Sequence, residues 1–230
     1  MSSVSQVVFM NQRSFSLPEP AIGDAYQGGF YAGLFSVNGN GVATHRLVVA
    51  SKSVGEFYGS WSASLSTSNG TSEFNGASNT AAMVAISSPL ATSCSNLVAG
   101  GYDDWYMPSR KEMEQLYFYF KPDTNQNNTQ MPRGGNGYAV PQRSNYTSSV
   151  PPRTPLSAWQ AAGDGSGGAQ FFNRGTDGSS PPFYWDSTET ASNKAIRREM
   201  RTGYYVGGYP VFGSFKNYQG NARAIRKVAI

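Results

Sequence analysis

The sequence contains only one cysteine and one histidine in 230 residues, and these absences exclude several kinds of protein. With Cys94 alone, no disulfide can form within the chain, so the fold must depend on its apolar core. With His45 alone, no serine–histidine or cysteine–histidine catalytic set of defined spacing can be proposed, and zinc-binding clusters are missing. We expect Cys94 to be a small buried residue and His45 to be structural.

Charge and long apolar runs are also scarce. Charged residues make up 14% of the chain, and no apolar run approaches the roughly 18 residues of a membrane-spanning helix. Residues 1–20 show no basic segment followed by an apolar one, so no secretion signal is predicted. The net charge of +4 arises in the C-terminal half, where Arg197, Arg198 and Arg201 form the densest basic cluster. Such a cluster is typical of a surface for an acidic partner or of a solvated loop with local ion pairs.

The strongest local pattern in the chain lies between Gly100 and Phe120. Ser109 and Glu112 have the spacing of a capping box, in which each side chain bonds a backbone N–H at the start of a helix. Four apolar residues follow at the helical positions i, i+3, i+4 and i+7: Met113, Leu116, Tyr117 and Phe120. Pro122 ends the pattern, so a helix with one buried face is predicted here.

A second, Ala-rich helix is predicted within residues 75–88, capped by Ser78 and ending before Pro89. Strand-like alternation or short apolar runs mark the remaining elements: residues 30–35, 41–50, 183–185, 194–201, 204–206, 211–216 and 222–229. Residues 47–50 should form a central, buried strand. The pattern indicates an α+β fold with twisted antiparallel sheets flanked by two helices.

Four segments in order resemble the Lcl C-terminal domain family, which is similar in fold to C-type lectins. They are G-G-Y-D-D-W-Y-M-P-S-R-K-E-M-E-Q-L-Y from Gly100, Y-W-D-S-T-E from Tyr184, R-A-I-R-K-V from Arg223 and G-D-A-Y-Q-G-G from Gly23. The resemblance implies one lectin-like domain over residues 21–230, preceded by an N-terminal arm or anchor over residues 1–20. Four residues of these motifs are assigned to the fold: Trp105, Tyr106, Trp185 and Arg226.

The long-loop region, residues 123–182, is rich in Asn, Gln, Gly, Ser and Pro. So long a segment without regular structure indicates functional loops or a linker. In lectin-like folds, ligands bind in this part of the chain, and its composition is typical of adaptable binding surfaces. A loop insert that packs against a neighbouring subunit is the alternative. We predict binding by six side chains: Tyr138, Arg143, Tyr146, Arg153, Trp159 and Phe171.

Catalysis has little support in the sequence. Asp103 with Asp104, and Asp186 with Glu189, are conceivable carboxylate pairs for glycoside hydrolysis, but the resemblance makes both pairs parts of structural turns. The fold is also similar to the formylglycine-generating enzyme, whose cysteine pair is missing. The calcium motifs of sugar-binding C-type lectins are absent, and no metal, cofactor or nucleic-acid site is predicted.

The sequence therefore predicts a non-catalytic structural protein of a bacteriophage virion: a tail, fibre, baseplate or capsid-decorating protein. A surface domain without a secretion signal is explained if the particle that carries it leaves the cell by lysis. Its expected partners are other virion proteins, copies of itself and a glycan or receptor on the host surface. The alternatives are a bacterial cell-surface carbohydrate-binding module and, less favoured, a glycan hydrolase.

Overall fold

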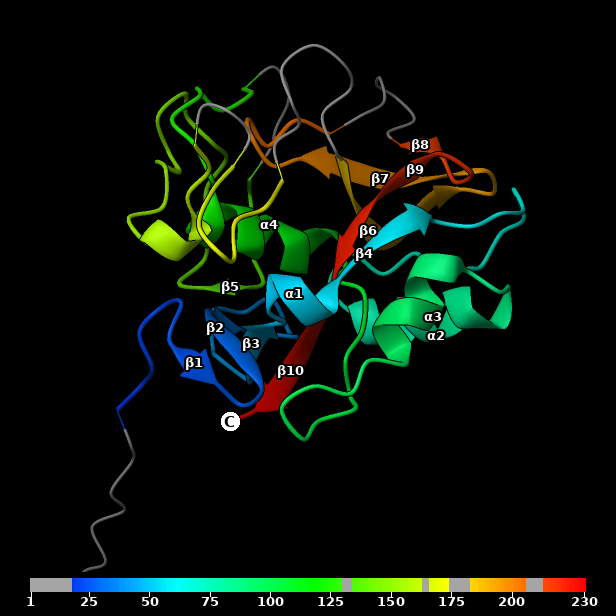
Figure 1. Cartoon of the computed structure of the whole chain (residues 1–230), viewed down its shortest axis with the longest axis horizontal. Helices are drawn as coiled ribbons and strands as arrows, with labels where there is room; N and C mark the ends of the chain where they lie inside the picture. The colour runs from blue at the N-terminus through cyan, green and yellow to red at the C-terminus, as the bar shows by residue number, and fades with distance from the viewer. Residues whose placement is uncertain (1–17, 130–133, 163–165, 174–182, 206–212) are drawn as a thin grey trace, which may run out of the picture.

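The computed structural model describes residues 18–129, 134–162, 166–173, 183–205 and 213–230. They form two curled, mainly antiparallel sheets and several helices, so the predicted α+β class is confirmed (Figure 1). Of the predicted N-terminal arm only residues 18–20 are described. There, Arg46 donates two hydrogen bonds of 2.8 and 2.7 Å to the Glu19 carboxylate, which joins the described end of the arm to the first sheet.

The first sheet has the strand order β1-β2-β3-β10, and β5 pairs with β2 beyond the bulge in that strand. All its pairs are antiparallel: β1 (Ala25–Tyr26), β2 (Gly29–Phe35), β3 (His45–Val49), β5 (Ala139–Val140) and β10 (Ile225–Ala229). Leu47, Val48 and Val49 are fully buried, which confirms the predicted central strand.

The second sheet has the order β4-β9-β6-β7-β8, and only the β6–β9 pair is parallel. Its strands are β4 (Glu56–Ser60), β6 (Phe183–Ala191), β7 (Lys194–Glu199), β8 (Ser214–Phe215) and β9 (Gln219–Arg223). The single strand predicted over residues 222–229 is wrong. The chain leaves the second sheet at Arg223 and enters the first at Ile225, and only Ala224 lies between the two strands.

In the described residues the sheets are accompanied by four α-helices, where the sequence predicted two, and by one 3-10 turn: α1 (Lys52–Gly55), α2 (Gly76–Ala85), α3 (Pro89–Ser95), α4 (Arg110–Phe120) and η1 (Ser157–Trp159). The predicted helix after Ser109 is confirmed as α4, and the Ser109 backbone N–H donates to Glu112 over 2.7 Å. The Ala-rich helix ends before Pro89 as predicted, but its cap is Asn75, whose side chain accepts from the Ser78 N–H. Pro89 opens α3, where its missing N–H is harmless.

Two apolar cores flank the segment between α3 and α4. One joins the first sheet, α4 and the long-loop region, and includes Tyr106. The other joins the second sheet to α2 and α3, and includes Trp105 and Trp185. Because successive side chains of an extended segment point to opposite sides, neighbouring residues enter different cores. Trp105, Tyr106, Trp185 and Arg226 are all nearly fully buried, which confirms their assignment to the fold.

Candidate functional site

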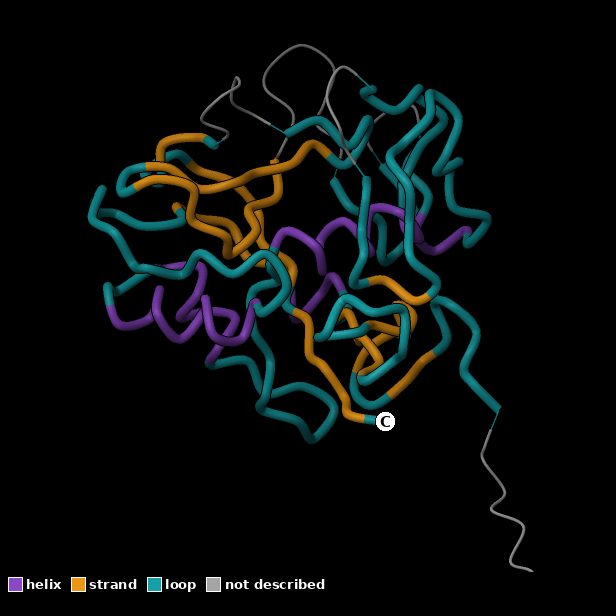
Figure 2. Tube along the Cα trace, turned by 180° about the vertical axis from the view of Figure 1, so that it is seen from behind, coloured by secondary structure: helices purple, strands orange, loops and turns teal. Residues whose placement is uncertain are grey.

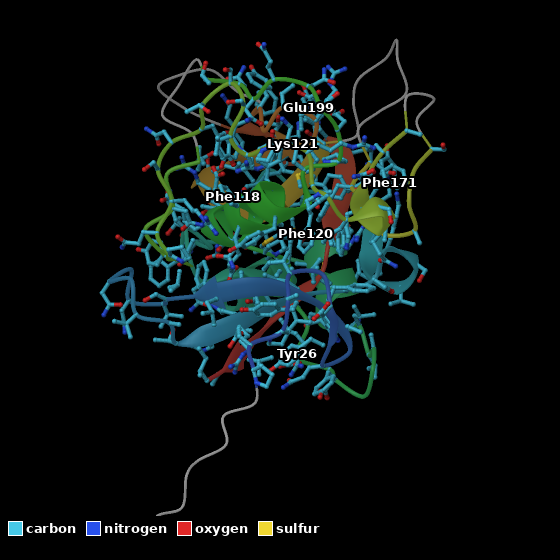
Figure 3. The ribbon with its side chains drawn as sticks, turned by 90° about the vertical axis from the view of Figure 1, so that its left-hand side faces the viewer. Tyr26, Phe118, Phe120, Lys121, Phe171 and Glu199 are labelled. Atoms are coloured by element: carbon cyan, nitrogen blue, oxygen red, sulfur yellow. The ribbon has the colours of Figure 1, made fainter. Side chains whose placement is uncertain are left out.

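The long loops gather beside α4, on the side away from α2 and α3 (Figures 1 and 2). The helix ends at Phe120, two residues before Pro122, as predicted. Lys121 then joins two loop segments, because its ammonium donates to the carbonyl oxygens of Asn125 and, over 3.5 Å, Pro151. Figure 3 shows Lys121 far from Tyr26 of the first sheet.

The two joined segments, residues 121–126 and 148–153, form the walls of a cleft with a volume of about 380 Å³. We call it the loop cleft. Most of the side chains on its walls end in a hydroxyl, an amide or a positive charge: Lys121, Thr124, Asn125, Gln126, Ser148, Ser149, Pro152 and Arg153. Hydroxyl and amide groups donate and accept hydrogen bonds, so the lining suits a polar ligand.

Asn127 connects the two walls of the cleft to each other and to α4. Its backbone N–H donates to Ser148 over 2.9 Å, and its amide donates to the carbonyl oxygens of Thr147 and Pro151 over 3.0 and 2.9 Å. The amide oxygen accepts from the Tyr117 hydroxyl of α4 over 2.6 Å. A buried side chain with its bonds satisfied rigidifies the backbone around it. The walls of the cleft are loops, but these hydrogen bonds fix them to α4.

Arg153 is held at the cleft by two backbone carbonyls. Its Nε donates to Pro122 over 3.2 Å, and its Nη2 donates to Ala161 over 2.9 Å. At the other wall, burial lowers the pKa of Lys121, and the nearby Asp123 carboxylate opposes that shift.

Three of the aromatic side chains predicted to bind ligand belong instead to the interior. Trp159 is 1% exposed and stacks on Phe120 of α4 with 3.9 Å between ring centres. Tyr146 is buried and donates to the Glu114 carboxylate. Phe171 lies at the edge of the interior, where the Lys52 ammonium is 3.4 Å from its ring centre. These loops fold back onto the domain and supply core residues, so the three rings are buried, whereas the predicted binding role requires exposed rings.

Tyr138 and Arg143 are half-buried and lie away from the loop cleft. The Tyr138 ring stacks on Phe74 with 4.6 Å between centres. The Arg143 guanidinium lies 3.8 Å from the centre of the Phe118 ring and also donates to the Tyr119 hydroxyl. Of the six predicted residues, only Arg153 lines the cleft. Lys121 and the hydroxyl and amide residues were missed, although the polar composition of residues 123–126 and 148–149 was a signal for them.

The predicted basic cluster is not a free positive surface. Arg198 is fully buried and pairs with Glu114 over 2.8 Å. Burial raises the pKa of Glu114, but the Arg198 charge and hydrogen bonds outweigh it and lower that pKa to about 2. Arg201 pairs with Glu199 over 2.8 Å. Arg198 and Arg201 thus form ion pairs, but Arg198 lies buried in β7 and not in the solvated loop of that interpretation.

Arg197, the third member, belongs to an exposed aromatic surface at the edge of the second sheet. Its guanidinium lies 4.5 Å from the centre of the Phe183 ring and 5.2 Å from that of Tyr218. Tyr218 and Phe215 are 46% and 39% exposed, and Lys194 lies over Phe215. We call these five residues the aromatic shelf. Exposed aromatic and arginine side chains are typical of protein interfaces.

In each of the two conceivable carboxylate pairs, one member is bound to a cation. Asp104 is bound by Arg226, and Glu189 pairs with Lys216 over 3.0 Å. Asp186 and Glu189 lie within β6 rather than in a turn, which corrects that expectation. Burial raises the pKa of Asp186 to about 8. These carboxylates are therefore engaged in packing and pairing.

His45 begins β3 as expected, and its Nδ1 lies 2.9 Å from the Thr44 hydroxyl. Burial, followed by the charge of Lys227, lowers its pKa. Cys94 is buried, as predicted, and burial raises the pKa of its thiol. In the described part of the chain, no group of three or more His, Cys, Asp and Glu side chains is arranged to hold a metal ion.

Comparison of the chain with models of protein families, with curated proteins and with solved structures finds no match. Among the described residues, no helix has both the length and the apolar character needed to cross a membrane. Support for a function therefore comes from the motifs and the geometry of the chain itself.

Proposed function

We propose that this protein is a non-catalytic structural component of a bacteriophage virion and that its loop cleft binds a glycan or receptor on the host surface. The loop cleft is the observation that carries the proposal. It is an open recess of about 380 Å³ that presents hydroxyl, amide and cationic groups beside a larger exposed area of carbon, and its walls are tied to α4 by Lys121 and Asn127. Fixed walls lower the entropic cost of binding, and hydroxyl and amide groups match the hydroxyls of a sugar.

The proposal includes a C-type-lectin-like fold of the Lcl C-terminal type. Its support is that the matching motifs meet in space. The Arg226 guanidinium from the last motif binds Asp104 from the central one. Lys227 likewise lies 3.0 Å from Glu112 of the capping box. Residues that a family uses to close its fold should form such contacts, whereas a chance resemblance has no reason to bring them together.

The aromatic shelf supports the assembly part of the proposal. Lys194 and Arg197 have no carboxylate within ion-pair distance among the described residues. A patch of exposed rings with excess positive charge is complementary to an acidic protein surface. We propose that this partner is a neighbouring virion protein, placed in a tail, fibre, baseplate or capsid decoration.

A bacterial cell-surface carbohydrate-binding module is the second candidate, since the loop cleft would serve it equally. Mass spectrometry of purified phage particles separates the two, because only a virion component is present in particles at stoichiometric amounts. A glycan hydrolase remains the third candidate. Release of reducing ends from host polysaccharide by the purified protein would establish it and overturn the non-catalytic assignment.

Adsorption of the labelled protein to a panel of bacterial strains tests the binding role. Deleting the long loops is unsuitable, because they supply Trp159 and Tyr146 to the core. Instead, Ser149→Trp fills the loop cleft from an exposed position, and Ala81→Trp on the exposed side of α2 is the matched control. Saturable adsorption lost only in Ser149→Trp is expected. Equal adsorption by both variants would place binding elsewhere on the molecule.

A further inference from the structure

The loop cleft has an asymmetry of charge. Two of the described residues that line it, Lys121 and Arg153, are cationic, and none of those described is Asp or Glu. The neighbouring Asp123 is 5% exposed, accepts from the Asn125 N–H over 3.0 Å and does not line the cleft. Among the described residues the lining cations therefore outnumber the lining carboxylates, which gives this part of the cleft a positive character.

Both cations retain donors that no described protein group uses. The hydrogen bonds of Arg153 employ Nε and Nη2 toward two carbonyls, out of the five N–H groups of a guanidinium. Lys121 employs two of its three N–H groups toward Asn125 and Pro151. Within the described part of the chain neither side chain has a carboxylate within 4.0 Å. Backbone carbonyls position these groups but leave their charges unneutralised.

We propose that the loop cleft selects an anionic saccharide, a sugar unit that carries an acid group. The acid group binds the Arg153 guanidinium, while the Lys121 ammonium, on a side chain only 2% exposed, adds positive charge beneath the surface. The sugar hydroxyls bond the uncharged side chains of the two walls: Thr124, Asn125, Gln126, Ser148 and Ser149. A volume of about 380 Å³ lies at the lower end of the range for small-molecule sites, which suits a short saccharide. This inference rests on the proposed glycan-binding function and names its ligand class.

A carboxylate and a phosphate would both satisfy a guanidinium beside an ammonium. Titration calorimetry with tri-galacturonate and with its neutral methyl ester tests the first, since the two share every hydroxyl. Titration with glucose 6-phosphate and with glucose, its uncharged counterpart, tests whether the cleft binds a phosphate. We expect at least one acid to bind tenfold or more tightly than its neutral counterpart, and salt to weaken that binding. Equal affinity for each acid and its neutral counterpart, or no binding of either acid at millimolar concentration, would overturn the inference.

Two substitutions locate the site. Arg153→Gln should weaken acid binding about tenfold or more without affecting a neutral sugar, and Arg143→Gln, outside the cleft, is its control. Because Arg153 also bonds two carbonyls, Thr124→Asp provides a second variant that removes no hydrogen bond. It adds a repelling charge at an exposed wall position, and Thr124→Asn is its neutral match. Acid binding unchanged in both Arg153→Gln and Thr124→Asp would contradict the inference.

The outcomes for ligand class and for general function are distinct. If Ser149→Trp abolishes adsorption to cells while neutral sugars bind as well as acids, the glycan-binding function stands and the anionic preference fails. If the acid binds in solution but no variant alters adsorption, the cleft is an anion-binding site and the host-attachment role fails.

Discussion

The Arg226 guanidinium binds the Asp104 carboxylate through two hydrogen bonds of 2.5 and 2.9 Å, and it lies 3.8 Å from the centre of the Tyr102 ring. It also donates to the Gln27 carbonyl over 3.2 Å. A single side chain in the last strand thereby joins the first hairpin to the segment that precedes α4. The planar fork of arginine makes both the paired bonds and the ring stacking possible.

Replacing Arg226 with lysine should destabilise the protein although the charge is kept. Lysine cannot form the paired bonds to Asp104 or stack as a plane on Tyr102. Because Asp104 is half exposed and partly screened by water, we expect a loss of about 1–2 kcal/mol in the free energy of unfolding by urea. Asp103→Asn, a change at an exposed neighbour, is the control. Equal stability of Arg226→Lys and the wild type would show that the fork geometry is unimportant.

Trp105→Ala should remove a large side chain from the core beside α3. The ring is 2% exposed, and its Nε1 donates to the Tyr102 carbonyl over 3.1 Å. We expect a loss of about 3–5 kcal/mol of unfolding free energy, typical of a buried tryptophan. Tyr58→Ala, at a ring 71% exposed, should change it by less than about 0.5 kcal/mol. A melting curve unaffected by Trp105→Ala would refute the structural role.

Trp159→Ala distinguishes a core residue from a sugar platform. The ring stacks on Phe120 and meets Phe30 edge-on at 5.5 Å, so its loss should cost about 3–5 kcal/mol of stability. Adsorption to cells, measured well below the lowered melting temperature, should persist. The contrary result, normal melting with lost adsorption, would restore the binding role predicted for this residue from the sequence.

Asp186 should make stability depend on pH. Burial raises its pKa in the folded protein to about 8 from an ordinary 3.8, so folding favours the protonated acid. The resulting stabilisation is complete below about pH 4 and is lost as the pH rises through 8. The slope is at most about 1.4 kcal/mol per pH unit.

Asp186→Asn keeps an oxygen for the Thr188 N–H, which donates over 2.9 Å to Oδ1, but it cannot ionise. Urea unfolding at pH 5, 6, 7 and 8 and constant ionic strength should give a falling stability for the wild type and a flatter profile for the variant. Asp103→Asn should follow the wild type. Parallel profiles for Asp186→Asn and the wild type would mean that Asp186 has the same pKa in the folded and the unfolded protein.

Local signals in the sequence predicted the parts of the fold that depend on neighbours along the chain. Ser109 and Glu112 bond each other within one helical turn. The apolar residues that follow them repeat at helical spacing, so they form one face that must be buried against a core. Both are confirmed in α4. The buried run of β3 was predictable for the same reason, because a strand enclosed on both faces is apolar throughout.

Contacts between distant segments explain what the sequence could not predict. Nothing near Trp159 indicates that Phe120 covers it, so an aromatic residue in a polar loop was wrongly expected to be exposed. The loop cleft depends on Lys121 reaching the Pro151 carbonyl, a contact between residues 30 apart. The change of sheet at Ala224 was missed as well, although two consecutive apolar residues, Ala224 and Ile225, interrupt the apolar–polar alternation there.

The passage from β9 to β10 has a consequence for how the chain must fold. β9 lies between β4 and β6, and β10 completes the first sheet beside β3. Until residues 219–229 have been synthesised, β4 and β6 have no strand between them and β3 lacks its outer neighbour. Pairings such as Glu56 with Arg223 close very large loops, which makes them slow to form. During translation the earlier strands therefore cannot complete their sheets before this late segment is synthesised. A ribosome stalled before residue 219 would hold a chain in which both sheets are incomplete.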